Sequence, residues 1–82
     1  MTETTELIRS LLVLVGPRIS ADEVADVDDW LDHREWGLAV DVLAEALSEN
    51  AVTLTARERE VFVHILHAIG YDVTDFANLL AQ

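Results

Sequence analysis

The sequence predicts an all-α fold, a compact antiparallel bundle of four to five short helices that forms one domain over residues 1–82. Apolar residues recur at intervals of three and four residues in five segments, and no segment shows the sustained alternation of a half-buried strand. The connections between these segments are short, so sequential helices should pack side by side. With 82 residues, of which 51% are hydrophobic, the chain can bury one modest core.

The first two helices have clear start and stop signals. One helix is expected from about Glu3 to Val15, and Gly16–Pro17 ends it because proline cannot continue a helix. The next begins after Ser20, which can form a capping box with Glu23, and ends near residues 32–33. The apolar faces that these helices should bury consist of Leu7, Ile8, Leu11, Leu12, Leu14 and Val15 in the first, and of Val24, Val27 and Leu31 in the second.

The second half of the chain predicts two long helices and a short one. The first of these runs from about Glu35 to Asn50. A second capping box, formed by Thr55 and Glu58, starts the next helix, and Gly70 should end it. The expected core residues are Trp36, Ala39, Val40, Leu43 and Leu47, then Val61, Phe62, Ile65, Ala68 and Ile69, and finally Val73, Phe76, Ala77 and Leu80 in a closing helix capped by Asp72 or Thr74.

The charge of the chain restricts its partners. Sixteen acidic residues outnumber five arginines, which gives a formal net charge of −11. Nucleic acids and anionic membranes bind through clusters of lysine and arginine, so both are disfavoured, whereas a basic partner is favoured. Solubility alone is the competing explanation for such a charge. The N-terminal stretch has acids in place of a basic region, and its apolar run is short, so we expect a cytoplasmic protein without a standard export signal.

The sequence offers few residues for catalysis or for a cofactor. His64 and His67, with Glu60 one turn earlier, could lie on one side of a helix, but no Glu-x-x-His motif completes a metal site, and a surface ion pair explains them better. Asp26 and Asp28 resemble the start of a calcium loop whose later positions do not match. The chain has no cysteine and no serine in a G-x-S-x-G motif. We therefore expect a protein that is not an enzyme and holds neither metal nor cofactor.

A binding surface is the stronger expectation. Acidic residues fall on the polar faces of the second and third predicted helices, and they would form one negative surface if these helices were neighbours. Trp30 and Leu38 are apolar residues among these acids, as in a partner-binding patch. The alternative is that Trp30, Leu38 and Val42 pack against a third helix, and Val42 is the best candidate for the core. The candidate partner-binding residues are Asp22, Asp26, Asp29, Trp30, Leu38, Asp41, Glu45 and Glu49.

The block "LDHREWGLAVDVLAEALSEN" resembles the small bacterial immunity proteins of the MafI type, which accompany polymorphic secreted toxins in contact-dependent inhibition systems. The shared pattern falls on Asp32, His33, Glu35, Trp36, Gly37, Ala39, Leu43 and Leu47. Arg34 stands where the family commonly has glycine, which suggests that this turn differs or forms without a positive φ. Gly37 should allow a neighbouring helix or the preceding turn to approach closely.

The resemblance implies a function. Such a protein binds the catalytic domain of its cognate toxin in the cytoplasm and blocks it without chemistry, and the toxins of these systems are often nucleases. A nuclease needs a basic surface to bind phosphate, which an inhibitor of charge −11 would complement. The alternative is a small acidic helical interaction module or a homo-oligomer without a toxin partner, which would associate through Leu38 and Val42.

Overall fold

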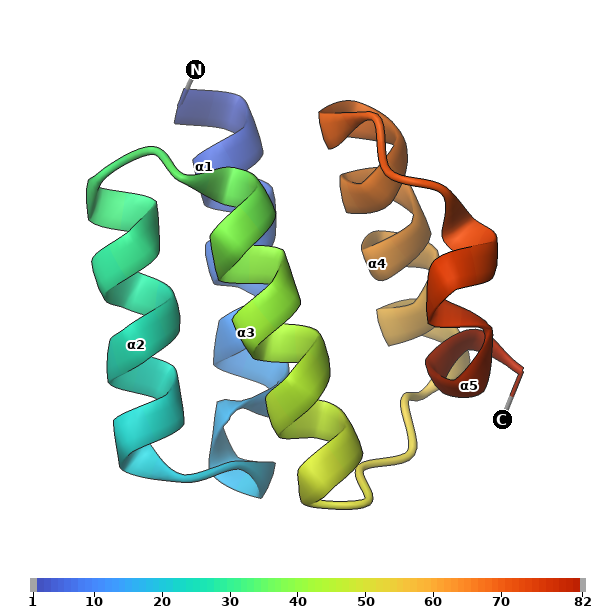
Figure 1. Ribbon diagram of the computed structural model, residues 1–82. Helices are drawn as coiled ribbons and strands as arrows, with labels where there is room; N and C mark the ends of the chain where they lie inside the picture. The colour runs from blue at the N-terminus through green and yellow to red at the C-terminus, as the bar shows by residue number, and fades with distance from the viewer. Residues whose placement is uncertain (1, 82) are drawn as a thin grey trace.

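A computed structural model describes residues 2–81 and confirms the all-α prediction (Figure 1). In this part of the chain, all regular structure is helical. The elements are α1 (Thr2–Val15), the 3₁₀ turn η1 (Gly16–Arg18), α2 (Ala21–Asp32), α3 (Trp36–Glu49), α4 (Ala56–Ile69), the 3₁₀ turn η2 (Val73–Phe76) and the short α5 (Ala77–Leu80).

Sequential long helices run antiparallel, as expected for short connections. Figure 1 shows α3 in front of α1, with α2 on one side of this pair and α4 with α5 on the other. The most extensive packing joins α2 to α3, and the next joins α1 to α4. The outward faces of α1 and α3 therefore lie on opposite sides of the bundle (Figure 1).

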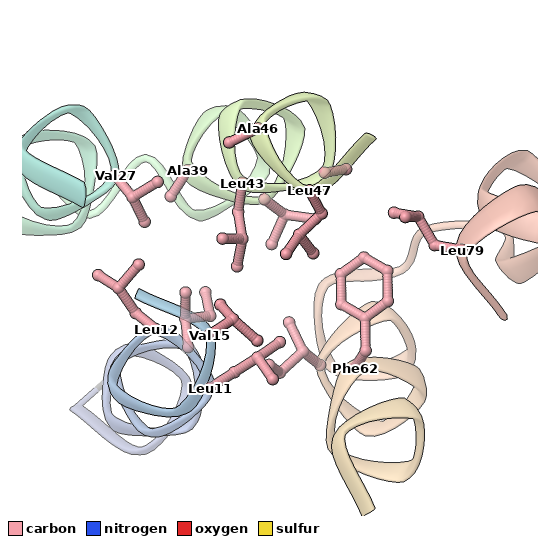
Figure 2. Packing of buried hydrophobic residues seen from close by; sticks show 14 of the residues in the cluster. Leu11, Leu12, Val15, Val27, Ala39, Leu43, Ala46, Leu47, Phe62 and Leu79 are labelled. Carbon is pink, nitrogen blue, oxygen red and sulfur yellow. The ribbon is translucent and has the colours of Figure 1, made fainter. Parts of the chain in front are cut away.

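The core forms where α1, α3 and α4 meet. Leu11 of α1, Leu43 of α3 and Phe62 of α4 are fully buried. In Figure 2 the ring of Phe62 projects from α4 toward α3 and α5, where Leu47 and Leu79 lie. The same ring meets Phe76 edge-on at a centroid separation of 5.5 Å. Phe62 thus links the main bundle to its C-terminal segment.

The helix starts follow the sequence prediction. Ser20 and Glu23 form a complete capping box before α2, and Thr55 and Glu58 form another before α4. Asp72 caps η2, because its side chain accepts a hydrogen bond from the Thr74 backbone at 2.9 Å. Such caps satisfy backbone N–H groups that have no partner within the helix, which explains why these boundaries could be predicted locally.

Several expected core positions are wrong. Leu14 is 46% exposed, because the buried stripe of α1 is narrower than predicted and follows Ile8, Leu11, Leu12 and Val15. Ala68 is also exposed. In the closing segment, Ala77 is exposed and Leu79 is buried in its place. Residues 73–76 form a 3₁₀ turn with three residues per turn, so the side chains that follow point in different directions than an α-helix would give them.

Three helices end with the same backbone motif. Arg34, Ala51 and Gly70 follow α2, α3 and α4 with φ angles of +57°, +51° and +77°. In each case the next residue donates a backbone hydrogen bond of 2.9 Å to a carbonyl five residues earlier, as in a Schellman motif. Of the two alternatives for the Arg34 turn, the one without a positive φ is therefore wrong. Hydrogen bonding to the end of α2 holds arginine in a conformation that favours glycine.

Candidate partner-binding surface

The helices α2 and α3 lie side by side (Figure 1). All six candidate acids on them are exposed. On α2, these acids project away from the buried Val27 and Leu31. On α3, they project away from the buried seam that contains Leu43. The exposed acids are Asp22, Asp26 and Asp29 on α2, and Asp41, Glu45 and Glu49 on α3. The condition for one negative surface, that these helices be neighbours, is met.

The net charge of the protein is concentrated in this pair of helices. Residues 20–50, which we call the acidic hairpin, contain ten acidic residues and one arginine, so they supply nine of the eleven net negative charges. The segments 1–19 and 51–70 each balance their acids with arginines. The acidic hairpin therefore carries most of the net negative charge of the protein.

The candidate acids take no part in the ion pairs of the described residues. Arg9 of α1 holds Asp28 and Asp32 of α2, each at 2.8 Å. Arg18 pairs with Glu58 at the start of α4. These contacts use acids at the flank of α2 and at a helix start, and they leave the charges of the outward faces without a counterion from residues 2–81.

Asp41 lies apart from the α2 acids. It follows Gly37 by one turn, on the side of α3 that faces Tyr71 of the C-terminal segment. Burial raises the pKa of Tyr71 above its ordinary value, and the carboxylate of Asp41 raises it further. On the α2 side of α3, by contrast, Asn50 donates a hydrogen bond of 3.0 Å to Glu23. Glu45, one turn after Asp41, lines a hollow with Asp75 and Asn78 of the C-terminal segment. Glu49, next to Asn50, is thus the α3 acid that extends the α2 surface best.

Two large apolar side chains remain uncovered at one end of the acidic hairpin. Trp30 in the last turn of α2 is 36% exposed, and Leu38 in the first turn of α3 is 43% exposed. The bundle leaves both at the surface, so the alternative of a covering third helix does not hold for Leu38. Val42 is partly buried against the core, in agreement with its ranking as the best core candidate. The exposed pair adds apolar contact area to the negative surface.

The sequence analysis assigned no binding role to His33 or Arg34 in the turn that joins α2 to α3. Nδ1 of His33 lies 2.8 Å from the carbonyl oxygen of Asp29. This contact raises the pKa of His33, and the charges of Asp29, Asp32 and Glu35 raise it further. The neighbouring Arg34 has an exposed side chain. In the sequence, this turn could have been recognised because His33 and Arg34 stand among the acids Asp29, Asp32 and Glu35.

Gly37 has the close neighbour that its position suggested, but the neighbour comes from elsewhere in the chain. A Cβ at Gly37 would collide with the hydroxyl of Tyr71 and would lie 3.3 Å from its Cζ. The expected neighbour was a helix or the preceding turn. Tyr71 instead follows α4, and its ring stacks on Phe76 with the centroids 6.0 Å apart.

The described residues include no cluster of side chains that could bind a metal ion. His64 and His67 lie exposed on α4. Within residues 2–81, no group of three or more His, Asp or Glu side chains comes together as metal ligands would. An open hollow of about 370 Å³ between α4 and α5 has mainly apolar walls, from Ala56, Arg59, Glu60, Val63 and Leu80.

None of the helices described here has the length and apolar character needed to cross a membrane. The chain matches no protein-family model, and neither the curated proteins nor the solved structures contain a significant match. The assignment of the surface therefore depends on the chemistry of its own residues.

Proposed function

We propose that this protein is an immunity protein, which binds the catalytic domain of a cognate secreted toxin and neutralises it in the cytoplasm. The observation that carries the proposal is the acidic hairpin, with nine of the eleven net negative charges and the uncovered Trp30 and Leu38. The resemblance of residues 31–50 to immunity proteins of the MafI type supports the same function. The protein acts by stoichiometric binding rather than as an enzyme.

The partner that fits this surface is a basic nuclease domain. A nuclease must bind phosphate, so its substrate channel carries lysine and arginine. A negative surface accelerates its encounter with such a domain through electrostatic steering, and it then occupies the region that nucleic acid needs. Within residues 2–81, no ion pair involves Asp26, Asp29 or Glu45. Their charges are therefore available for this role.

Trp30 and Leu38 supply the short-range part of the interface. Charges at the rim of an interface set the association rate, whereas buried aromatic and aliphatic side chains hold the complex together. Both residues lie at the end of the acidic hairpin where α2 turns into α3. We therefore place the centre of the interface at this end, with the acids of α2 and α3 extending from it along the hairpin.

Co-expression tests the proposal directly. The protein is produced together with the C-terminal domain of the toxin that a neighbouring gene would encode. Growth, complex formation and the salt dependence of association are then measured. We expect rescue of growth and a one-to-one complex whose association rate falls steeply with salt. Failure of the wild-type protein both to rescue growth and to bind would refute the proposal.

A pair of triple variants then locates the surface. Reversal of Asp26, Asp29 and Glu45 to lysine should abolish rescue. Reversal of Glu3, Glu6 and Glu60 to lysine changes the net charge equally but lies on α1 and α4. This control variant should keep most of the inhibition. Equal losses in the two variants would mean that only the total charge matters, and intact inhibition in the first would exclude the acidic hairpin.

A second candidate function is a homo-oligomeric interaction module. The observation in its favour is that α1 exposes Val13 by 75% and Leu14 by 46%. Sedimentation equilibrium separates the candidates. A stable dimer that dissociates on Val13→Asp or Leu38→Asp would favour the module, whereas a monomer without the toxin would exclude it.

A further inference from the structure

Arg34 occupies a backbone conformation that arginine does not favour. Its φ is +57°, and it closes the end of α2 by donating a backbone hydrogen bond of 3.0 Å to Leu31. The next residue, Glu35, donates to Trp30 at 2.9 Å and completes the Schellman motif. A side chain with a Cβ is disfavoured in this left-handed region, and glycine is the usual residue there. The φ angle therefore gives no reason for an arginine, whose charge after the end of α2 gains only the modest attraction of the helix dipole.

The side chain of Arg34 is not used by the described fold either. Arg9 and Arg18 form ion pairs, and Arg59 donates to the carbonyl of Leu54 at 2.7 Å. Arg57 on α4 is exposed and, like Arg34, has no such contact within residues 2–81, but it lies outside the acidic hairpin. For Arg34, residues 2–81 supply neither an ion pair nor a side-chain hydrogen bond, and the side chain is exposed. The adjacent Asp32 is held by Arg9 instead, at 2.8 Å.

The location of Arg34 is also distinctive. It is the one arginine of the acidic hairpin, which contains no lysine. It lies in the turn between the uncovered Trp30 of α2 and Leu38 of α3, at the end where we place the centre of the interface. A single cation at this point would be repelled by a uniformly basic partner, so its presence carries information about the partner.

We propose that Arg34 is a specificity contact, which pairs with a carboxylate that the partner carries inside its basic surface. This inference rests on the proposed function. The planar guanidinium binds a carboxylate through two parallel hydrogen bonds, and such pairs are strong when water is excluded. Metal-dependent nucleases combine the two features, because carboxylates hold Mg²⁺ within a site that also binds phosphate.

The sign of the charge effect tests this assignment. If only the long-range field mattered, removal or reversal of the Arg34 charge would strengthen binding to a basic partner. A pairing with a carboxylate predicts the opposite. We expect Arg34→Gly to bind about 10-fold more weakly and Arg34→Glu about 100-fold or more, mainly through faster dissociation.

Ala51→Gly is the matched control, because Ala51 occupies the equivalent position after α3 with a φ of +51°. Both glycine variants should raise the melting temperature by a few degrees, since both relieve the same backbone strain. Only Arg34→Gly should lose affinity for the toxin domain used in the co-expression experiment. A folding defect cannot explain a loss of affinity in a protein that has become more stable.

Each outcome of this experiment decides the inference. Weaker binding by Arg34→Gly and Arg34→Glu, with unchanged binding by Ala51→Gly, supports it. Equal or tighter binding by the Arg34 variants overturns the carboxylate contact and leaves the proposed function intact. Absence of binding by the wild-type protein overturns the proposed function and this assignment with it.

Discussion

Arg18 and Glu58, 40 residues apart in the sequence, form an ion pair of 2.5 Å that joins η1, the turn after α1, to the first turn of α4. The side chain of Glu58 is only 7% exposed. Its second oxygen accepts a hydrogen bond of 2.9 Å from the backbone of Thr55. Because both carboxylate oxygens have a partner, the buried charge is compensated. A capping residue that sequence analysis treats as local is thus also a tertiary contact.

Removal of this carboxylate should destabilise the protein strongly. Glu58→Ala leaves Arg18 and the Thr55 backbone without their partner, and we expect a loss of about 2–3 kcal/mol in the free energy of unfolding. Urea denaturation measures this loss. The matched control is Glu23→Ala, which removes the equivalent carboxylate from the exposed capping box of α2 and should have a smaller effect. Equal effects would show that the Arg18 contact adds nothing to capping.

The same carboxylate should make stability depend on pH. Burial alone would raise the pKa of Glu58, but the hydrogen bonds from Thr55 and Arg18 and the charge of Arg18 reverse this, and the folded pKa lies below the ordinary 4.5. A depressed folded pKa stabilises the protein above pH 4.5, and this stabilisation is lost as the pH falls through the folded pKa. We expect the difference in unfolding free energy between wild type and Glu58→Gln to shrink below pH 4.5. A constant difference between pH 7 and pH 3 would contradict this assignment.

Replacing Gly37 of α3 with alanine should destabilise the protein, although alanine usually stabilises a helix relative to glycine. Gly37→Ala gains up to about 1 kcal/mol of helix propensity, but its Cβ would meet a tyrosine ring that stacks on Phe76. Overpacking of this kind costs about 1–3 kcal/mol, so we expect a net loss of about 1 kcal/mol. In a Tyr71→Leu background the same substitution should be neutral or stabilising. Thermal unfolding of the four proteins gives the answer, and an unchanged effect in both backgrounds would rule out the collision.

Local signals account for what the sequence predicted well. The capping boxes that begin at Ser20 and Thr55 depend on residues three positions apart, so they could be recognised without tertiary information. The same is true of the apolar seam of α3, and of Gly70 at the end of α4. The exposure of the candidate acids also followed from helical periodicity, once α2 and α3 were placed on the chain.

The features that escaped prediction depend on contacts between distant residues or on unusual backbone. Nothing near Gly37 in the sequence indicates that Tyr71 will lie against it. The burial of Leu79 depends on a 3₁₀ turn whose residues are equally compatible with an α-helix. Arg34 looked like evidence against a left-handed turn, yet hydrogen bonds to the end of α2 impose one. The proposal that Arg34 contacts a partner depends on that conformation, which the sequence did not reveal.

Ala51 and Gly70, which follow α3 and α4 with positive φ angles, should change the free energy of unfolding in opposite directions when they are substituted. Ala51→Gly removes a Cβ from a backbone with φ of +51° and should stabilise the protein by about 0.5–1 kcal/mol. Gly70→Ala introduces a Cβ at φ of +77°, where no atom lies within 4 Å, so its cost of about 1 kcal/mol comes from the backbone alone. Chemical denaturation of both variants checks the pair. A stabilising Gly70→Ala would mean that the end of α4 does not adopt this motif in solution.

The fluorescence of Trp30 should report the negative surface even without a partner. Trp30 is 36% exposed among carboxylates, whereas Trp36 is partly buried and donates a hydrogen bond of 2.9 Å to Thr5. The local potential concentrates cations and repels anions, so caesium should quench the wild-type emission more effectively than iodide does. Salt should reduce this preference, because the Debye length shrinks to about 3 Å at 1 M. The variant Trp30→Phe, which retains only Trp36, should lose most of the quenching by either ion. Equal quenching by caesium and iodide at low salt would show that Trp30 does not lie in a negative field, and the interface would then have to be placed elsewhere.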